Sequence, residues 1–375
     1  MVVGTRCGHS SPMIKCPATD ETGMTYRAGI IGAGGVAGLG IYSGSKDDIG
    51  SEPVETSHAG GYAATDGIEL VAIADRDPDR LSTFGRAWDI PAPSRYNSHA
   101  AMLTDADLDV VSVCTPTMFH AEHVLDAAQH VDAIWCEKPL ACSVRDGTRM
   151  VDACAEANVD LVVNHSRRFM SQNQAVRELI ADGLLGDVHT ASVAASGELF
   201  RVTTHVIDLA TFLLDDRAAT IAGHITGTSV APADLAGRDL DDAGGGGFVV
   251  TQDGVFLTID GVAPREDALW YCRIVGTDGH VVLDDRGWTF WEHGADGAVE
   301  TPLSIKQTET YADTFSTVTD HLIGLLEGAA EPISPGDESL ASLEVLVGLY
   351  LSHYTDGRVC VPFNDPLADV TISSW

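Results

Sequence analysis

The sequence predicts an α/β protein with two domains. The first is expected to contain a doubly wound parallel sheet, and the second is an α/β domain with an open, largely antiparallel sheet. Three observations support this. A glycine-rich turn follows the first apolar run, apolar runs alternate with helical segments up to residue 164, and apolar runs separated by hairpin signals follow. Alternating strands and helices are typical of a parallel sheet, whereas strands joined by tight turns are antiparallel.

The first apolar run ends at residues 32–37, which read Gly-Ala-Gly-Gly-Val-Ala and fit the G-x-G-x-x-A pattern of a strand-to-helix turn. In such a turn Gly32 permits the tight bend, Gly34 lets a pyrophosphate approach the backbone, and Ala37 allows the helix to pack close to the strand. The N–H groups at the helix start then face an anion. The candidate cofactor-binding residues here are Gly32, Gly34, Gly35, Val36 and Ala37.

A second apolar run, residues 68–74, ends at Asp75. In a dinucleotide-binding fold an acid at this place accepts hydrogen bonds from the adenosine ribose hydroxyls. Asp75 favours NAD because its charge repels the additional phosphate of NADP, while Arg76 directly after it can accommodate that phosphate. We expect NAD as the cofactor, with NADP as the alternative.

The remaining elements of both domains follow from apolar runs and helical periodicity. In the first domain we expect strands at residues 109–114, 132–136 and 160–164, and helices at 121–129 and 144–157. In the second we expect helices at residues 173–182, 308–326 and 337–353, and strands at 188–195, 247–251, 255–259, 271–274 and 280–283.

The chain divides into three parts. Residues 1–23 are polar and lack the apolar core of a signal peptide, so we expect a disordered tail or a true start at Met24. Residues 24–164 are expected to form the NAD(P)-binding domain. Residues 165–375 are expected to form the substrate-binding and oligomerisation domain, with its last helices packed on the first domain.

An insertion lengthens the first strand-helix-strand unit beyond the roughly 30 residues expected. It covers residues 46–67 and is rich in Gly, Ser, Asp and Glu. A surface loop or a lid beside the cofactor cleft would account for it. For its His58 and Tyr62 the solvated loop is the favoured interpretation.

The charge balance excludes several partners. The 55 acidic residues outnumber the 22 basic ones, which gives a formal net charge of −33. Such a field repels nucleic acid and anionic membranes, and no apolar run reaches the ~20 residues that span a bilayer. The acidic surplus and the scarcity of lysine are typical of a halophilic protein, since molar salt screens the self-repulsion. We expect a cytoplasmic protein without a nucleic-acid or membrane partner.

The eight cysteines form no C-x-x-C pair and show no spacing typical of a zinc site. We therefore expect a reduced protein without a metal.

Two segments carry side chains suited to catalysis. Lys138 follows a predicted strand within Glu137-Lys138-Pro139, where ligands of an open α/β sheet bind. A lysine there can stabilise charge on a substrate oxygen, and Glu137 can hold the nicotinamide ribose. His205 and Asp208 share a helix face, and a histidine can accept a carbinol proton as hydride leaves. An exposed strand-end lysine and a core histidine are the structural alternatives.

Taken together, these motifs resemble the glucose-fructose oxidoreductase, inositol dehydrogenase and MocA family over about residues 26–362. The shared motifs are residues 32–37, Ala74-Asp75, Cys114-Thr115-Pro116 with His120, Glu137-Lys138-Pro139, Arg167-Arg168-Phe169 and His205-x-x-Asp208-Leu209. The resemblance implies a Rossmann domain and NAD(P)-dependent oxidoreduction of sugars, polyols and related compounds.

The resemblance also implies roles for single residues. Lys138 would orient and polarise the reacting hydroxyl, and His205 would act as acid and base. Asp208 would bind substrate or brace His205. Further cofactor contacts are implied for Thr115, Pro116, His120 and Glu137, and a further substrate contact for Arg168.

The chain departs from the family pattern just before the histidine. Many members carry an Asp four residues before it and a Gly two before it, where this chain has Arg201 and Thr203. Arg201 cannot act as a carboxylate partner of His205. It can instead bind an anionic group, such as a sugar-acid carboxylate or a phosphate, by a bidentate contact.

The sequence therefore predicts an NAD(P)-dependent dehydrogenase acting on a carbohydrate-like small molecule, and a homodimer or homotetramer that pairs through the second sheet. Two alternatives stay open. One is a hydrolase that uses NAD in a transient oxidation to break a glycosidic bond. The other is a nucleotide-sensing protein without turnover, against which the retention of Lys138 and His205 argues.

Overall fold

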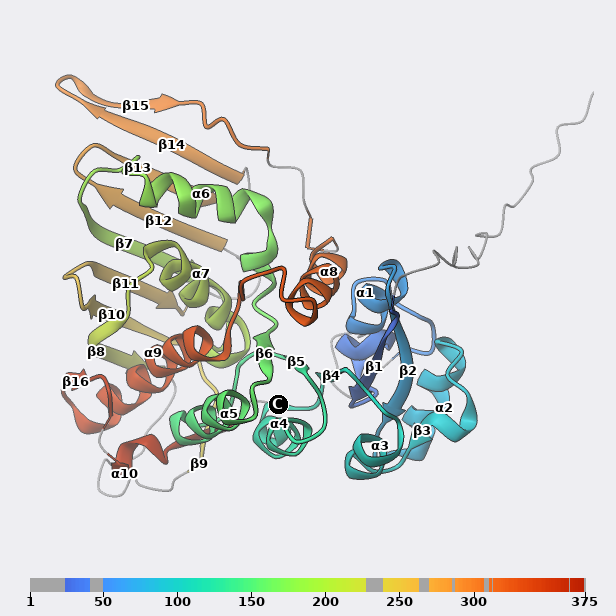
Figure 1. Ribbon diagram of the computed structural model, residues 1–375. Coiled ribbons are helices and arrows are strands. Elements are labelled where there is room, and N and C mark those ends of the chain that lie inside the picture. The colour runs from blue at the N-terminus through green and yellow to red at the C-terminus, as the bar shows by residue number, and fades with distance from the viewer. Residues whose placement is uncertain are drawn as a thin grey trace, which may run out of the picture.

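The computed structural model describes residues 24–40, 50–226, 239–262, 270–284, 287–306, 310–311, 313–363 and 365–373. Two large sheets lie side by side in it, each with its own helices (Figure 1). The tail expected at residues 1–23 lies outside the described residues. Among the helices that are described, none is long and apolar enough to cross a membrane.

The N-terminal sheet has six strands in the order β3-β2-β1-β4-β5-β6, all parallel. Its strands are β1 (Tyr26–Ile31), β2 (Ile68–Ala74), β3 (Arg95–Tyr96), β4 (Val110–Val113), β5 (Ala133–Cys136) and β6 (Asp160–Val163). Every residue of β4 and β5 is buried, as is typical of strands covered on both faces. The order reverses between β1 and β4, where ligands of such sheets bind. The doubly wound prediction is confirmed.

Helices connect these strands. They are α1 (His58–Ala64), α2 (Pro78–Ala87), α3 (His99–Asp105), α4 (His120–Ala127) and α5 (Val144–Ala157). Local sequence sets their starts. The Asp77 carboxylate accepts hydrogen bonds from the first N–H groups of α2, and Pro78 takes the first helical position. The Ser143 hydroxyl accepts the N–H of Asp146 at the start of α5.

The first crossover differs from the expectation. The glycine turn leads into a short helical turn, η1 (Gly35–Leu39), and the chain forms α1 only after an intervening segment. Residues 46–49 of the expected insertion lie outside the described residues. His58 and Tyr62 are 0% and 2% exposed, so the interpretation of a solvated loop is wrong for them. The glycines that suggested a loop let α1 approach its neighbours closely.

The C-terminal sheet has nine strands in the order β15-β14-β13-β12-β7-β11-β10-β8-β16. They are β7 (Val188–Ala195), β8 (Ala218–Ile225), β10 (Gly245–Thr251), β11 (Phe256–Gly261), β12 (Trp270–Gly276), β13 (Gly279–Asp284), β14 (Gly287–Gly294), β15 (Gly297–Thr301) and β16 (Val359–Cys360). Only the β7–β11 pair of this sheet is parallel. The largely antiparallel prediction is confirmed. A separate short pair joins β9 (Asp239–Asp241) to β17 (Thr371–Ser373).

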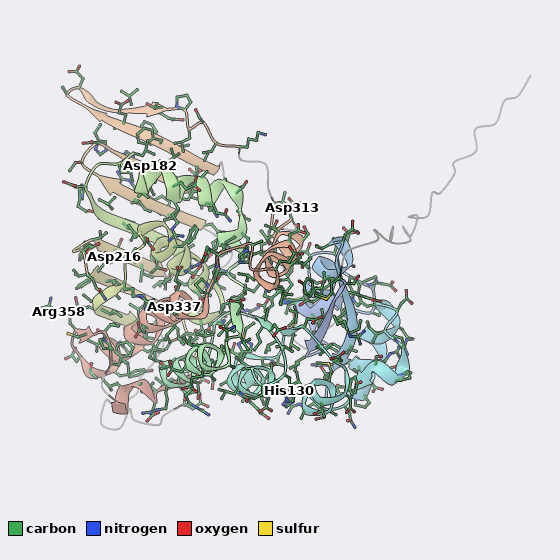
Figure 2. The ribbon with its side chains drawn as sticks, viewed as in Figure 1. His130, Asp182, Asp216, Asp313, Asp337 and Arg358 are labelled. Atoms are coloured by element: carbon green, nitrogen blue, oxygen red, sulfur yellow. The ribbon has the colours of Figure 1, made fainter. Side chains whose placement is uncertain are left out.

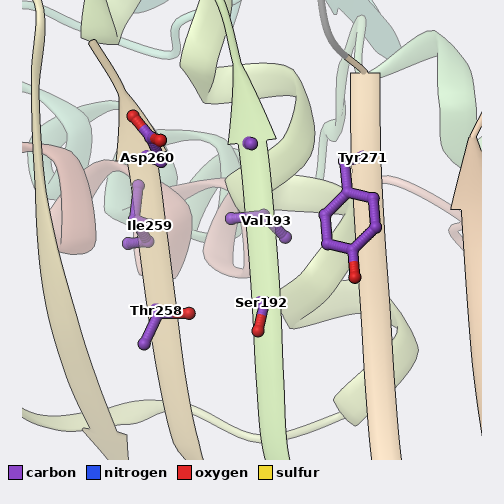
Figure 3. Close-up of a pocket in the computed structure, with 7 residues that line it drawn as sticks. Ser192, Val193, Thr258, Ile259, Asp260 and Tyr271 are labelled. Carbon is purple, nitrogen blue, oxygen red and sulfur yellow. The ribbon is translucent and has the colours of Figure 1, made fainter. Parts of the chain in front are cut away.

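One face of this sheet is covered by helices and the other is more open (Figure 1). The covering helices are α6 (Ser171–Ala181), α7 (Thr204–Leu214) and α9 (Gly336–Thr355). In β12, Cys272 and Ile274 are buried, whereas the alternating Tyr271 and Arg273 are partly exposed. On the open face a hollow of about 500 Å³ crosses β11, β7 and β12 (Figure 3). Its lining residues are Ser192, Val193, Ala194, Thr258, Ile259, Asp260 and Tyr271.

The helix α8 (Thr314–Leu326) packs on the N-terminal domain, where it contacts α1 and β5. Phe315 and Val318 belong to the same buried cluster as Ile30 of β1. A Cβ atom on Gly61 of α1 would lie 2.6 Å from the carbonyl oxygen of Phe315, so α1 and α8 approach each other closely. A segment near the end of the chain therefore completes the core of the first domain. The last helix is α10 (Asp365–Ala368).

Acidic side chains lie on the outside of the molecule. Asp182, Asp313 and Asp337 are exposed, on three different helices or loops (Figure 2). Asp337 pairs with Arg217 at 2.9 Å, but exposed pairs of this kind contribute only about 0–1 kcal/mol. The acidic excess at the surface is therefore much larger than local pairing can balance.

Gly61→Ala is expected to lower the free energy of unfolding. Alanine normally favours a helix over glycine by about 1 kcal/mol, but here the new Cβ presses on the backbone of α8, and overpacking costs about 1–3 kcal/mol. Denaturant unfolding measures the change. The control is Ala63→Gly, at an exposed position of the same helix, which loses only helix propensity. A stabilised G61A would contradict the close contact between α1 and α8.

Candidate active site

The glycine turn leaves open space where its middle glycine lies. Gly32 has φ +98°, and a Cβ there would meet Thr115 and the Cys114 carbonyl at 2.9–3.0 Å, so this position requires glycine. Gly34 is different, because the nearest atom to a Cβ would be the Cys114 oxygen at 3.9 Å. Packing within the described chain therefore does not explain Gly34. Room for a ligand does, and Ala37 is fully buried behind the turn.

Asp75 lies directly beside this turn, at the end of β2. Its Oδ2 accepts the N–H of Ala33 at 2.7 Å and its Oδ1 accepts the N–H of Asp77 at 2.8 Å. The carboxylate is thus fixed next to the glycines while remaining partly exposed. The neighbouring Arg76 is exposed, and its guanidinium lies 4.8 Å above the ring of Phe119.

The buried side chain of His120 contacts the loop after β4 and the loop after β5. It is 1% exposed, with Nδ1 3.0 Å from the Pro139 oxygen and Nε2 2.9 Å from the Thr115 oxygen. Burial lowers its pKa despite these carbonyl partners. Because backbone oxygens occupy both ring nitrogens, direct cofactor binding by His120 is corrected to a structural role. Thr115 is partly exposed and Pro116 exposed at the same edge.

Glu137 is bound into a buried hydrogen-bond network. Its Oε1 accepts from His58 Nε2 at 3.0 Å and from the amide of Asn164. His58 Nδ1 lies 3.0 Å from the hydroxyl of Ser112, which in turn meets the hydroxyl of Tyr62 at 2.7 Å. Burial raises the pKa of Glu137, but the bond and charge of His58, with Lys138 and Asn164, lower it below its usual value. The carboxylate is therefore ionised and fixed, with one oxygen already bonded.

Lys138 reaches from the first domain to the second. Its Nζ donates a hydrogen bond of 2.9 Å to the backbone oxygen of Arg201, in the helical turn η5 (Leu199–Thr203) that leads into α7. That turn is fixed by Asp242, whose carboxylate accepts the N–H groups of Phe200 and Arg201 at 3.0 Å each. Burial lowers the pKa of Lys138, and Glu137 raises it in part.

His205 lies at the start of α7 and is partly exposed. Its ring centre is 5.7 Å from the indole of Trp270. Burial lowers its pKa well below the usual value, and the charges of Lys138, Arg167 and His165 lower it further. The two residues expected to perform catalysis, Lys138 and His205, thus come close enough for one charge to act on the other.

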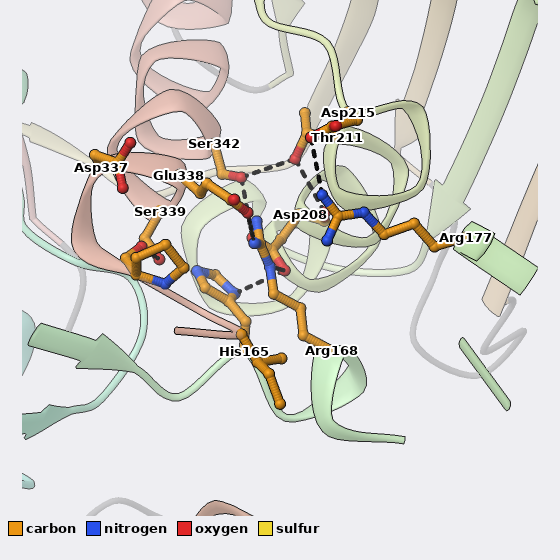
Figure 4. Close-up of polar contacts among 12 residues, drawn as sticks. His165, Arg168, Arg177, Asp208, Thr211, Asp215, Asp337, Glu338, Ser339 and Ser342 are labelled. Carbon is orange, nitrogen blue, oxygen red and sulfur yellow. Dashed lines mark hydrogen bonds and ion pairs between the residues drawn. The ribbon is translucent and has the colours of Figure 1, made fainter. Parts of the chain in front are cut away.

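Arg168 and Asp208 bind each other rather than solvent (Figure 4). Each is 1% exposed, and Arg168 Nε and Nη2 donate to the carboxylate at 3.0 and 2.8 Å. Ser342 donates to the same carboxylate, and Glu338 also binds Arg168. Both residues were expected to contact substrate; we correct this, because the ion pair uses their charges to hold η4 (Ser166–Phe169) against α7 and α9.

His165 is close to Asp208 of this ion pair, and its charge also acts on His205. Its Nδ1 is 3.5 Å from Asp208 Oδ2 (Figure 4), so the carboxylate faces His165 and not His205. The alternative in which Asp208 braces His205 is therefore not what the geometry shows. Burial lowers the pKa of His165 to about 4, against the opposing charge of Asp208.

Sequence patterns did not indicate several residues that the structure brings into this region. His58 was noticed but placed in a loop, and its pairing with Glu137 crosses 79 positions. The guanidinium of Arg167 lies 3.9 Å above the indole of Trp270, next to His205. Only its position in the Arg-Arg-Phe motif could have indicated Arg167. No local pattern marks Asp242.

Comparison with known proteins is consistent with this geometry. A family model described as "Oxidoreductase family, NAD-binding Rossmann fold" (Gfo/Idh/MocA) matches residues 26–165. D-xylose 1-dehydrogenase (NADP(+)) 2 of Haloferax volcanii is 30% identical over 300 residues, which cover 80% of this chain and 77% of that protein. The chain belongs to the Gfo/Idh/MocA family.

Other known proteins match this chain over most of their length. D-apiose dehydrogenase of Paraburkholderia graminis is 28% identical, covering 81% of this chain and 86% of that protein. Inositol 2-dehydrogenase of Rhizobium meliloti is 26% identical, covering 85% of this chain and 94% of that protein. An oxidoreductase domain protein of Kribbella flavida has the same fold, with a TM-score of 0.74 at 17% identity over 91% of this chain and 100% of that one. The chain is thus an NAD(P)-binding oxidoreductase of a family of sugar and polyol dehydrogenases.

For this Gfo/Idh/MocA protein, Gly34→Ala is expected to weaken NAD binding at least ~10-fold without lowering the melting temperature, because its methyl group enters ligand space rather than the core. Gly32→Ala is the matched control and should destabilise the fold, since its φ of +98° is strained for alanine. Calorimetric titration with NAD, together with thermal unfolding, measures both. Unchanged NAD affinity in G34A would show that the turn does not cradle the cofactor.

Proposed function

We propose that the protein transfers a hydride between NAD(P) and the carbinol or carbonyl carbon of a sugar, polyol or sugar acid. The observation that supports this most is the contact of Lys138, across the two domains, with the turn that precedes His205. Lys138 follows β5 of the cofactor sheet, and its Nζ binds the turn from which the His205 helix begins. A cation and a proton acceptor beside a nicotinamide site are the groups that alcohol oxidation requires.

The residues of the first domain fit a dinucleotide. The open space at Gly34 and the N–H groups of η1 suit a pyrophosphate, and the carboxylate of Asp75 lies where ribose hydroxyls are bound. The bound nicotinamide supplies the hydride acceptor or donor. Glu137 has one carboxylate oxygen engaged by His58, so it fixes the turn next to Lys138 more firmly than an exposed acid would.

The protein's own residues handle the substrate oxygen and its proton. Lys138 Nζ donates a hydrogen bond to that oxygen and stabilises negative charge on it as the alcohol loses its proton. His205, neutral because of its lowered pKa, accepts this proton, and in the reverse direction the protonated ring returns it. The positive charges around His205 disfavour the imidazolium, so the proton is passed on to solvent readily.

We propose NAD as the preferred cofactor, with NADP accepted. Asp75 places a fixed negative charge beside the glycine turn, which repels a ribose phosphate. Arg76 acts in the opposite direction, because it is exposed and needs only to leave the ring of Phe119 to reach that phosphate. The Haloferax volcanii relative carries NADP(+) in its name.

We further propose a cytoplasmic homodimer or homotetramer adapted to high salt. The open face of the second sheet, with its hollow over β11, β7 and β12, supports pairing of subunits there. The formal charge of −33 supports work in molar salt, where the Debye length falls to about 3 Å. Assays of this protein therefore belong in molar KCl.

The hydrolase and the sensor are the competing functions. Neither gains support from the geometry, because Lys138 contacts the turn before His205 and a sensor has no need of both side chains. An assay that follows NADH absorbance separates them. Net cofactor reduction indicates a dehydrogenase, sugar release without it a hydrolase, and cofactor binding with neither a sensor.

Lys138→Ala and His205→Ala are each expected to lower kcat by about 10²–10⁴-fold, because each removes a group that acts on the reacting oxygen or its proton. Reduction of NAD and NADP is measured in molar KCl against aldoses, inositols, sugar acids and sugar phosphates. Lys306→Ala and His130→Ala remove the same side chains at exposed places outside the site and serve as controls. Near-normal turnover in either site variant would remove that residue from the mechanism.

In the pH profile of kcat/KM for alcohol oxidation, the fall on the acidic side (the acid limb) is expected well below pH 6.5. His205 must be neutral to accept a proton, and a lowered pKa means that the neutral form persists as the pH falls towards that lower value. The profile from pH 4.5 to 8 gives the limb directly, after stability has been checked at each pH. A limb at or above 6.5 would show that a different group, or an unshifted His205, is the base.

A further inference from the structure

The guanidinium of Arg167 is the uncompensated charge of the active site. It lies 3.9 Å above the indole of Trp270, and the same indole is 5.7 Å from the ring centre of His205. Within the described part of the chain, no carboxylate or other acceptor is bonded to this guanidinium. Burial lowers its pKa to about 10, so it stays protonated at neutral pH.

The acidic groups that influence this region are bonded elsewhere. Asp208 is taken by Arg168, Glu137 by His58 and Asn164, and Asp242 by the backbone of η5. The phenol of Tyr311 also fails to neutralise Arg167, because burial and the charge of Glu137 raise its pKa to about 12. These acids therefore already have hydrogen-bond partners, and among the described residues none of them bonds the guanidinium of Arg167.

A partly buried cation without a bonded anion raises the free energy of the folded protein, and a ligand that supplies an anion lowers it. A guanidinium without a partner loses hydration and gains no hydrogen bond in return. Its stacking on Trp270 covers one face and leaves the N–H groups at its edge for a planar, bidentate acceptor. A carboxylate has that geometry, and a phosphate presents a similar pair of oxygens. A neutral sugar presents only hydroxyl groups, whose hydrogen bonds to a cation are weaker.

We propose that Arg167 binds an anionic group of the substrate, so that the protein prefers a sugar acid or a sugar phosphate to the neutral sugar. This rests on the proposed dehydrogenase function and makes its substrate class more specific. The reacting carbinol lies at Lys138 and His205, and the anionic group lies at the edge of the guanidinium above Trp270. Arg167 thereby determines specificity, while the proton and the oxygen remain with His205 and Lys138.

The test compares substrates matched in all but charge. Oxidation of D-glucose, D-glucuronate and D-glucose 6-phosphate is measured with the wild type and with Arg167→Met, all at one salt concentration. Methionine keeps an apolar side chain over Trp270 and removes the guanidinium with its N–H donors. A charged hydrogen bond of this kind corresponds to roughly 10–100-fold in affinity. We expect kcat/KM of the wild type to be at least ~10-fold higher for an anionic substrate than for D-glucose. In R167M, kcat/KM for that anionic substrate should fall ~10–100-fold, while kcat/KM for D-glucose should change less than ~3-fold.

Arg177→Met is the matched control. Arg177 also lies over an aromatic ring, 4.6 Å from the centre of Phe212, but it pairs with Asp215 outside the site. R177M should leave all three kcat/KM values unchanged. Arg167→Lys, which keeps the charge without the planar fork, should fall between the wild type and R167M on the anionic substrate.

Binding without turnover separates this inference from the function on which it rests. Calorimetric titration of the protein–NADH complex with D-glucuronate and, separately, with D-glucose 6-phosphate reports the anion contact directly, and the stronger of the two identifies carboxylate or phosphate. Equal kcat/KM for charged and neutral members, with R167M weakening all of them alike, would overturn the inference and leave the dehydrogenase intact. Anion binding that depends on Arg167 with no hydride transfer to any member of a broader panel would instead overturn the dehydrogenase.

Discussion

The hydrogen bond from Lys138 Nζ to the backbone oxygen of Arg201 links the two domains at the place where chemistry is proposed. Both ends of this bond are fixed independently. On one side, Glu137 and its partner His58 hold the turn that carries the lysine. On the other, Asp242 holds η5, and Tyr350 of α9 donates to Asp242. The position of one amine therefore depends on polar groups from the first crossover, from the segment between β9 and β10, and from the last long helix.

Much of this architecture was predictable because it rests on local patterns. The glycine turn, the buried strands and helix α5 each have a signature within a few residues, and residues 144–157 were predicted with the observed bounds. The motifs that contain Lys138 and His205 also indicated that these two segments approach each other, as the bond from Lys138 to Arg201 shows. β8 and β15 were not, because the buried residues of β8 do not alternate regularly and β15 has no buried residue.

The missed parts of the site depend on contacts between distant positions. Helix α1 was taken for a loop because glycine and serine favour turns locally, yet tertiary packing against α8 overrides that preference. Arg168 and Asp208 look like ligand-binding residues from their motifs, but their charges are satisfied by each other across 40 positions. A sequence shows which charges are present, while only the fold shows which remain uncompensated, as at Arg167.

The core of the N-terminal domain has a consequence for the order in which the chain can fold. Phe315 and Val318 of α8 are part of the buried cluster that contains Ile30 and Tyr62. During synthesis from the N-terminus, a ribosome has therefore produced more than three hundred residues before this cluster can close. Until then the nascent cofactor domain exposes apolar surface, which makes such intermediates prone to aggregation. Chaperone demand and the rate of translation should thus matter more for this domain than its position at the start of the chain would suggest.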